Sequence, residues 1–320
     1  MRVVPKTGQG DISKDILSGI TITVVIFAVS VYMPIIGFVS ALLIPLPTLF
    51  YRSKLGRTTG AIIPVLTIIL MVAVLRGISI DILFFFELLL LGFIMSELFE
   101  LDLSVEKTLL YACSSVLCTG IVCLLFYSKI AKIGIIALVS EYVAKNLELT
   151  LALYKDIGVS KETIRMISAS LENIQYVLIR IIPAIVIAST FFVSWICLLL
   201  SKPMLKRRDL FYPDFGALNL WKAPEPLVWG LIGSGVLLIL PYTAFKIIGL
   251  NGLLILMTIY FFHGMAIVSF YFERKQFPRI LRFFLYSLIA LQQVVLLIVI
   301  GLGIFDMWLN FRKIELKEDN

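Results

Sequence analysis

The stretch DILFFFELLLLGFIMSELFE, from Asp81 to Glu100, sets a carboxylate, Glu87, among leucines and phenylalanines that avoid water. About 20 consecutive apolar residues span the hydrocarbon core of a bilayer as an α-helix. Because lipid offers the backbone no hydrogen-bond partners, a spanning segment must be a helix or part of a closed barrel. The stretch is continuously apolar and does not alternate between polar and apolar residues, so it predicts a membrane-spanning helix.

The whole chain shares this apolar character. Of its 320 residues, 60% are hydrophobic and only 15% are charged, against roughly 25% charged in an ordinary soluble domain. The mean hydropathy is +1.02, and no soluble core of this size hides that much apolar surface. We therefore expect an all-α protein, a polytopic transmembrane helix bundle that forms a single integral membrane domain over residues 1–320.

The apolar runs predict eight or nine crossings. The second run is short and carries Pro45 and Pro47, so it forms either a full span or a re-entrant or broken element. The expected crossings are 16–33, 35–50, 58–75, 78–99, 108–127, 176–200, 227–245, 250–272 and 282–308.

An amphipathic segment, 128–175, separates the N-terminal helices (1–127) from the C-terminal helices (176–320). Its apolar residues recur at helical spacing with charged residues between them, which predicts amphipathic surface helices in 131–175. One helix is expected to stop at Gly158 and the next to start with Ser160 as its cap. The segment is either a lid over the bundle or a passive connector.

Clusters of basic residues indicate the orientation. The positive-inside rule assigns KPMLKRR (202–208) and ERKQFPR (273–279) to the cytoplasm. We therefore expect a multi-pass protein of the cell membrane whose N-terminus lies in the cytoplasm. The first helix, behind Arg2, Lys6 and Lys14, is expected to be retained because no cleavage site leads into a hydrophilic domain. Topology and anionic membrane lipid explain the net charge of +7. No zinc or helix-turn-helix pattern suggests nucleic acid.

Few patterns for chemistry are present. Three of the four cysteines are five residues apart, so they do not share a helix face as metal ligands would. His263 is the one histidine, and no G-x-x-x-x-G-K-[ST] phosphate loop occurs. We expect no cofactor, no metal and no enzymatic activity, and any ATP-driven transport would require a separate ATPase.

A sparse set of residues at membrane depth remains as candidates for a site. An ionised carboxylate facing lipid is costly, so Glu87 should face the bundle, pair with a cation or be protonated. Arg180 is a candidate cation for Glu87, or it snorkels to the outer surface. Each candidate either contacts a substrate or ion, or ties helices together through hydrogen bonds. The candidates are Glu87, His263, Gln292, Gln293, Tyr260 and Arg180.

The C-terminal half carries two motifs, NGLLILMTIYFFHGMAIVSFYFERKQFP (251–278) and LIVIGLGIFDMWLNFRK (297–313). With YKDIGVSKETI, RIIPAIVI and LNLWKAPEPLVW upstream, they resemble the YybS-like family of predicted bacterial membrane proteins. The family's terminal signature, G-x-x-D-x-[WF]-x-[DN]-[FL]-R, is matched by Gly303, Asp306, Trp308, Asn310, Phe311 and Arg312. The N-terminal half is similar in style to the S components of energy-coupling-factor transporters, to which the family looks distantly related. The resemblance implies no catalytic residue.

Three functions are compatible with these features. The first is a transporter or substrate-binding membrane subunit for a small-molecule cargo, coupled to a separate ATPase. The second is a membrane scaffold or regulator that docks a cytoplasmic partner protein through the basic loop 201–225, where aromatics and prolines lie among basic residues. The third is an intramembrane enzyme acting on lipid, for which the sequence offers no paired acid and base.

Overall fold

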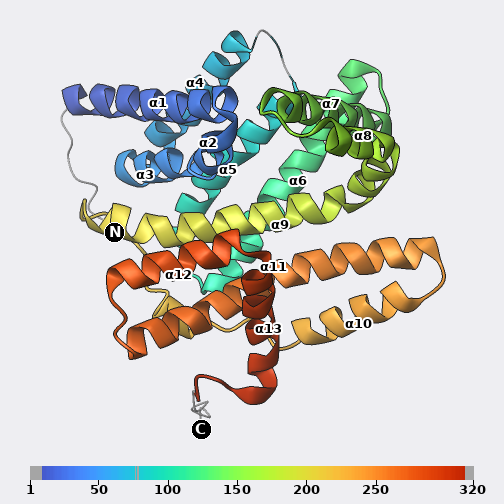
Figure 1. Ribbon diagram of the computed structural model, residues 1–320. Helices are drawn as coiled ribbons and strands as arrows, with labels where there is room; N and C mark the ends of the chain where they lie inside the picture. Colours follow the sequence, from blue (N-terminus) through green and yellow to red (C-terminus); the bar gives the residue numbers. More distant parts are fainter. Residues whose placement is uncertain (1–8, 76, 78, 314–320) are drawn as a thin grey trace. The chain divides into compact units, whose positions relative to one another are not determined.

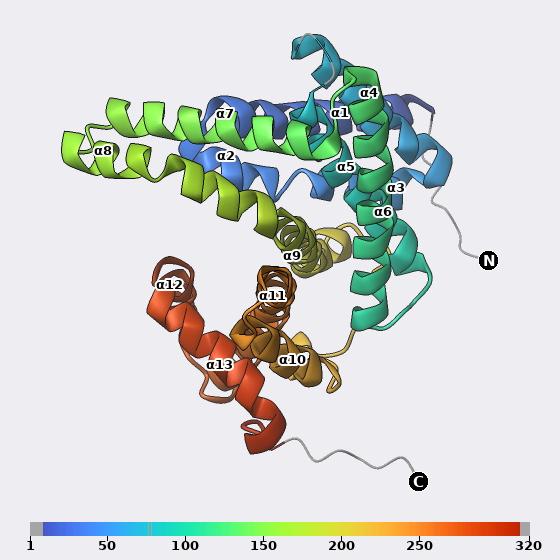
Figure 2. The ribbon, with the colours of Figure 1, turned by 90° about the vertical axis from the view of Figure 1, so that its right-hand side faces the viewer.

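The structure, a computed structural model, describes residues 9–75, 77 and 79–313. Within these residues it contains α-helices, one short 3-10 helix and no strand (Figures 1 and 2), which confirms the all-α prediction. Arg2 and Lys6 lie outside the described residues. The helices are α1 (Gln9–Tyr32), α2 (Pro34–Ala41), α3 (Pro45–Leu55), α4 (Arg57–Val74), α5 (Ile80–Glu100), α6 (Val105–Ala131), α7 (Ile135–Asp156), α8 (Lys161–Ala169), α9 (Leu171–Lys206), η1 (Leu218–Leu220), α10 (Leu227–Ile239), α11 (Thr243–Arg274), α12 (Arg279–Leu291) and α13 (Gln293–Leu309).

The chain forms two compact units. Unit 1 comprises Met1–Ile179 and Ser189–Asp214, and unit 2 comprises Arg180–Ala188 and Phe215–Asn320. Helix α9 therefore contributes to both units. That all of the chain acts as one integral membrane domain stays a prediction.

The expected number of crossings is not confirmed. By length and composition, the described residues contain six helices that can cross a membrane, or seven if a bent pair counts as one span. The six are Ile12–Tyr32, Arg57–Val74, Ile80–Glu100, Val105–Ala131, Leu171–Lys206 and Thr243–Arg274.

The missing crossings are those in which the helix breaks. The expected crossing 35–50 is divided into α2 and α3, because Pro45 cannot donate the backbone hydrogen bond that a continuous helix needs. In 227–245, helix α10 ends at Ile239, just before Pro241. In 282–308, helices α12 and α13 are bent by 99° at Gln292. Apolar length alone did not reveal these breaks.

In unit 1, α2 and α3 bring the chain back beside the start of α1. The Lys54 ammonium at the end of α3 lies 2.7 Å from the Asp15 carboxylate near the start of α1. The second segment is therefore a broken element, which is one of the alternatives predicted from Pro45 and Pro47.

The amphipathic segment 128–175 is helical, as predicted. Helix α7 is followed by Gly158 in the left-handed region (φ 80°), and α8 begins after Ser160, whose hydroxyl accepts from the Thr163 amide at 3.2 Å. The start of α9 returns to α7, because the Gln175 side chain donates to the Ser140 carbonyl at 3.2 Å and hydroxyl at 3.0 Å. A position on the membrane surface stays a prediction.

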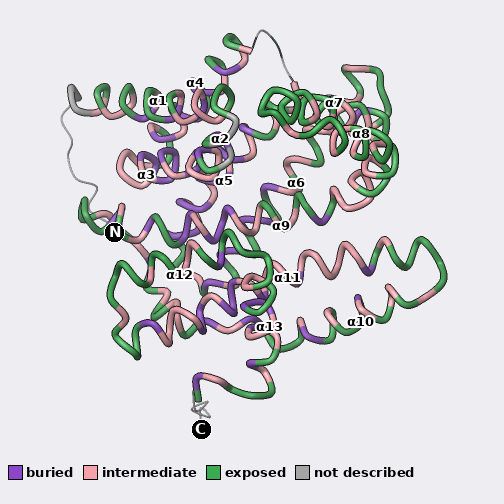
Figure 3. The backbone as a smooth tube through the Cα atoms, in the orientation of Figure 1, coloured by how far each residue is buried: buried purple, intermediate pink, exposed green. Residues whose placement is uncertain are grey.

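In unit 2, α11 and α13 cross with their backbones close together. The buried residues gather where the two helices meet, whereas α12 is mostly exposed (Figure 3). A Cβ atom at Gly264 would overlap the carbonyl oxygen of Val299, and one at Gly303 would overlap that of Tyr260. Two glycines therefore permit this crossing, as small residues commonly do between membrane helices.

We expect Gly264→Ala to destabilise unit 2. The added methyl group meets backbone, which cannot rotate away as a side chain could, so a loss of about 1–3 kcal/mol is expected. The measurement is thermal unfolding of the detergent-solubilised protein. Gly233→Ala is the matched control, because nothing beyond its chain neighbours and its own helix backbone lies within 4 Å of the added Cβ. Equal melting temperatures of the two variants would contradict the close crossing.

Candidate functional site

A buried polar cluster lies at the crossing of α11 and α13. We call it the His263 cluster; it comprises Tyr260 and His263 of α11, Asp306 of α13 and Arg312 just beyond α13. The four residues are at most 3% exposed. Charged groups at this depth are costly unless they are paired, so their arrangement has to be accounted for atom by atom.

Asp306 is the centre of the cluster. Its Oδ2 atom lies 3.1 Å from His263 Nε2 and 3.0 Å from Arg312 Nη2, and its Oδ1 atom accepts from the Phe311 amide at 2.8 Å. The chain can turn back because Asn310 adopts a left-handed conformation (φ 38°), as residues that follow a helix often do. One carboxylate therefore holds the turn that follows α13, pairs with Arg312 and contacts α11.

Arg312 joins the cluster to the loop that contains η1. Its Nη1 atom donates to the carbonyl oxygens of Asn219 at 2.9 Å and Trp221 at 3.0 Å. The Trp221 ring then packs edge-on against the His263 ring, with centroids 6.1 Å apart. The residues around η1 thus form a cover over the His263 cluster, and Arg312 holds it in place.

His263 has contacts of opposite character at one nitrogen. Its Nε2 atom is 3.1 Å from an acceptor, Asp306 Oδ2, and 3.0 Å from a donor, Arg312 Nη2. A ring nitrogen is either a donor or an acceptor in a given tautomer, so one of the two contacts at a time is a hydrogen bond. A proton moved between Nε2 and Nδ1 therefore changes which neighbour the ring binds.

Within residues 9–75, 77 and 79–313, three polar atoms of the cluster have no hydrogen-bond partner: Tyr260 Oη, His263 Nδ1 and Arg312 Nε. A buried polar atom without a partner costs about 1–3 kcal/mol, and most such atoms in native proteins are paired. The three atoms are the polar groups of the cluster for which the described residues provide no partner.

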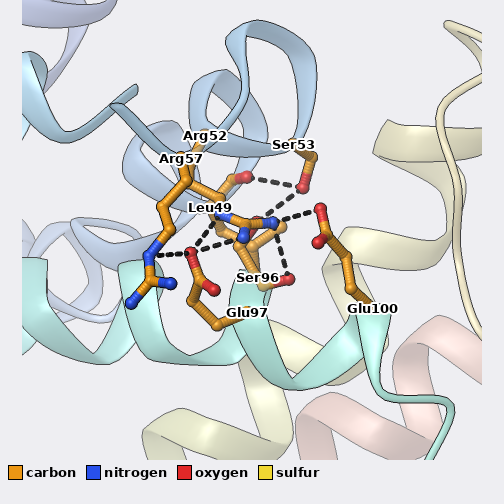
Figure 4. Close-up of polar contacts among 7 residues, drawn as sticks. All are labelled: Leu49, Arg52, Ser53, Arg57, Ser96, Glu97 and Glu100. Atoms are coloured by element: carbon orange, nitrogen blue, oxygen red, sulfur yellow. Dashed lines mark hydrogen bonds and ion pairs between the residues drawn. The ribbon is translucent and has the colours of Figure 1, made fainter. Parts of the chain in front are cut away.

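Unit 1 contains a second ionic cluster, between α3 and α5, that is fully satisfied (Figure 4). Arg52 is 2% exposed; its Nε atom donates to Glu97 at 2.8 Å, its Nη1 atom donates to the Ser96 carbonyl at 3.2 Å, and it pairs with Glu100. The Ser53 and Ser96 hydroxyls lie 2.8 Å apart. No atom of Arg52 lacks a partner, so we interpret this Arg52 cluster as a structural clamp between the two helices.

Glu87 lies on α5, half-buried against α6. A Cβ atom at Gly120 of α6 would overlap the Glu87 carboxylate, so the glycine makes room for it. Within the described residues no hydrogen bond or ion pair involves Glu87. It lies in unit 1 and Arg180 in unit 2, so the pairing of the two stays a prediction.

Asp81, in the first turn of α5, accepts a hydrogen bond from another helix. The Tyr142 hydroxyl of α7 donates to the Asp81 carboxylate at 2.8 Å. Burial of the phenol, together with this hydrogen bond, raises the pKa of Tyr142 to about 12, so Tyr142 remains a donor at neutral pH.

The structure brings two of the six candidates together. Tyr260 and His263 are stacked, with ring centroids 6.4 Å apart. Gln292 and Gln293 lie exposed at the bend between α12 and α13. The backbone carbonyl of Arg180 accepts from the Asn251 amide at 2.9 Å. Whether any of these residues binds a substrate stays a prediction.

Sequence reasoning missed the partners of His263. Asp306 and Arg312 were noticed only as members of a family signature, and Arg52 and Glu97 were not singled out at all. The terminal signature was the available signal for Asp306 and Arg312. The described residues contain no group of three or more His, Cys, Asp or Glu that could hold a metal ion.

The comparisons with known proteins agree with the predicted resemblance. Residues 21–307 match a family described as "Predicted membrane protein (DUF2232)". The chain is 24% identical over 304 residues to "Uncharacterized protein YybS" of Bacillus subtilis (strain 168), which covers 92% of this chain and 94% of that protein. No solved structure matches. Neither match concerns an S component, so that likeness stays a prediction.

Proposed function

Since the chain belongs to the DUF2232 family of predicted membrane proteins, we propose that it is a transport or substrate-binding subunit that holds a small polar molecule at the His263 cluster. It resides in the cell membrane with its N-terminus in the cytoplasm, and a separate ATPase supplies any energy from ATP. The observation that carries the proposal is the group of unpartnered buried atoms on Tyr260, His263 and Arg312.

The chemistry of these atoms selects the kind of ligand. Arg312 Nε is a donor, the Tyr260 hydroxyl donates or accepts, and His263 Nδ1 does either according to its tautomer. A small molecule with oxygen acceptors, such as a carboxylate, has the hydrogen-bonding chemistry that these three atoms can match. The ligand enters when the residues around η1 move, which requires release of the two hydrogen bonds from Arg312 to Asn219 and Trp221.

We expect Tyr260→Phe to lose the bound molecule without loss of stability. The Tyr260 hydroxyl has no partner in the part of the chain that the structure describes, so we expect its removal to be neutral or stabilising in the absence of ligand. Native mass spectrometry of protein extracted gently from its own membrane measures the retained molecule, and thermal unfolding measures stability. Tyr242→Phe is the matched control, since that residue is exposed.

The two opposite outcomes are distinct. If Tyr260→Phe keeps the same small molecule as the unmodified chain, the ligand does not bind at the His263 cluster. If Tyr260→Phe unfolds at a clearly lower temperature than Tyr242→Phe, the hydroxyl is a structural group. Either result contradicts the proposal.

The second candidate function is a scaffold that docks a cytoplasmic protein through the basic loop. Arg207, Arg208 and Phe211 are exposed there, while the Tyr212 hydroxyl donates to the Leu198 carbonyl at 3.1 Å and anchors the loop. The same mass spectra separate the two functions. A retained small molecule or an ATPase favours transport, and a partner without nucleotide-binding motifs, together with no small molecule, favours the scaffold.

A further inference from the structure

Helix α11 contains one asparagine, Asn251, and the side chain of this residue binds backbone groups of two helices. Its Nδ2 atom donates to the carbonyl oxygens of Arg180 at 2.9 Å and Ile247 at 2.8 Å, and its Oδ1 atom accepts from the Ala184 amide at 2.9 Å. Ile247 belongs to α11, whereas Arg180 and Ala184 belong to α9. All four residues lie in unit 2. The Asn251 amide therefore joins α11 to α9 within one unit.

The two backbone groups of α9 that Asn251 contacts form a helical pair. In an α-helix the N–H of one residue donates to the carbonyl four residues before it, so Ala184 and Arg180 are partners in a regular α9. Asn251 offers an acceptor to the first and a donor to the second, and thus bridges the pair from outside the helix. A side chain that inserts into the hydrogen bonds of a helix in this way is a known cause of bending.

Pro183 loosens α9 at the same turn. It has no N–H to donate to the Ile179 carbonyl, and its ring crowds that carbonyl. Helix α9 nevertheless continues on both sides of the proline, from Leu171 to Lys206. Pro183 therefore weakens one turn without ending the helix, and the Asn251 amide supplies hydrogen bonds at that turn.

The turn at Pro183 has two arrangements in which the Ala184 and Arg180 backbone groups are paired. In the bridged arrangement, which the structure shows, both groups bind the Asn251 amide. In a closed arrangement Asn251 is withdrawn, and the Ala184 N–H donates directly to the Arg180 carbonyl. Neither arrangement leaves these two groups without a hydrogen bond, so exchange between them avoids the main cost of breaking a helix.

We propose that Arg180–Ala188 is a hinge in α9 and that Asn251 is the latch that holds this hinge in its bridged arrangement. Arg180–Ala188 is the part of α9 that belongs to unit 2, while the helix on either side belongs to unit 1. The latch is on the same helix as His263, which is about 18 Å from Asn251 at 1.5 Å per residue. A movement of α11 that withdraws Asn251 thus changes the bend of α9. The proposal does not depend on a ligand at the His263 cluster.

A pair of substitutions tests the latch in the chain with its native cysteines. Asn251→Leu removes the amide, and we expect it to lower the melting temperature of the detergent-solubilised protein by about 3 °C or more. In a Pro183→Ala chain the same substitution should lower it by less than half as much. Alanine restores the hydrogen bond to the Ile179 carbonyl, so the turn no longer depends on Asn251.

Thr258→Val is the matched control for Asn251→Leu. Thr258 is also a half-buried polar residue of α11, and its hydroxyl donates to the Leu254 carbonyl of the same helix at 3.0 Å. The control should lower the melting temperature equally with Pro183 and with Pro183→Ala. If Asn251→Leu also lowers it equally in the two chains, Asn251 is an ordinary contact between helices and the latch is overturned.

Spin labels measure the hinge itself. One label is placed at Asn173→Cys of α9 and the other at Ile248→Cys of α11 or at Trp229→Cys of α10, all of which are exposed. Two reference positions are used because a movement perpendicular to one line changes the other distance. A bend that changes by about 20° at Pro183 moves residue 173 by about 5 Å, since about 15 Å of helix lies between them.

The labelled chain keeps its buried cysteines, Cys113 and Cys197, and carries alanine in place of Cys118 and Cys123. We expect one narrow distance for each label pair while Asn251 is present. Asn251→Leu should shift at least one of the two distances by several ångströms, or add a second distance. Unchanged distances in both label pairs after Asn251→Leu overturn the hinge.

Discussion

Arg312→Met is expected to lower the free energy of unfolding by about 3–5 kcal/mol, because it leaves the Asp306 carboxylate buried without its cation. Both side chains are at most 1% exposed, so water cannot replace the lost partner. The loop around η1 also loses its two hydrogen bonds to Arg312. Thermal and denaturant unfolding in the same detergent measure the loss, and trypsin cleavage at Lys222 reports release of the loop.

A double variant distinguishes the loss of stability caused by an unpaired charge from the loss caused by altered packing. Arg312→Met with Asp306→Leu removes both charges, and replacing a whole buried pair by apolar groups is often close to neutral. We expect it to regain part of the stability that the single variant loses. Arg208→Met, at an exposed position, is the control and should change stability by less than about 0.5 kcal/mol. If Arg312→Met has the same melting temperature as Arg208→Met, Arg312 does not stabilise the protein by pairing with Asp306.

Arg52→Met is expected to destabilise unit 1 by about 1.5–3 kcal/mol, the usual range for hydrogen bonds to charged groups. The effect is smaller than for Arg312, because Glu97 and Glu100 are 27% and 51% exposed and regain water when the guanidinium is removed. Helix α3 should then separate from α5. Hydrogen exchange of the α3 amides measures this separation, and thermal unfolding measures the stability.

The two carboxylates of the Arg52 cluster should contribute unequally. Glu97 pairs with Arg52 through two nitrogens and also lies near Arg57, while Glu100 accepts at one nitrogen and is more exposed. Glu97→Gln is therefore expected to cost more stability than Glu100→Gln. Glu148→Gln is the control, since Glu148 is an exposed carboxylate outside the Arg52 cluster. The reverse order of the two glutamine variants would show that the clamp works through Glu100.

The terminal family signature acquires a physical explanation from the structure. Gly303 lets α13 approach the Tyr260 backbone, Asp306 and Asn310 end the helix, and Arg312 fastens the loop around η1. All of these residues help to enclose the His263 cluster between α11, α13 and the loop around η1. A pattern in the chain thus corresponds to one local structure, although its purpose was not visible from the residues alone.

The sequence by itself determined that the chain is helical and that it belongs in a membrane. Lipid leaves the backbone no other partner, so a long apolar run is a helix whatever its neighbours are. Local signals were also reliable, as Ser160 at the start of α8 and Pro45 at the break before α3 show. Such signals depend on contacts within a few residues, and the sequence displays these directly.

Only the tertiary structure decided which polar residues share a site and where the last helices end. The three residues His263, Asp306 and Arg312 meet through the crossing at Gly264 and Gly303, and Arg52 meets Glu97 from 45 residues away. Glu87, the charged residue in the most apolar surroundings of the sequence, belongs to unit 1, whereas the His263 cluster belongs to unit 2. The reason is physical. An apolar side chain can be buried against many different neighbours, whereas a buried charge is stable only beside a specific partner. Which residues become neighbours depends on how the helices pack, and the spacing of residues along the chain does not show this.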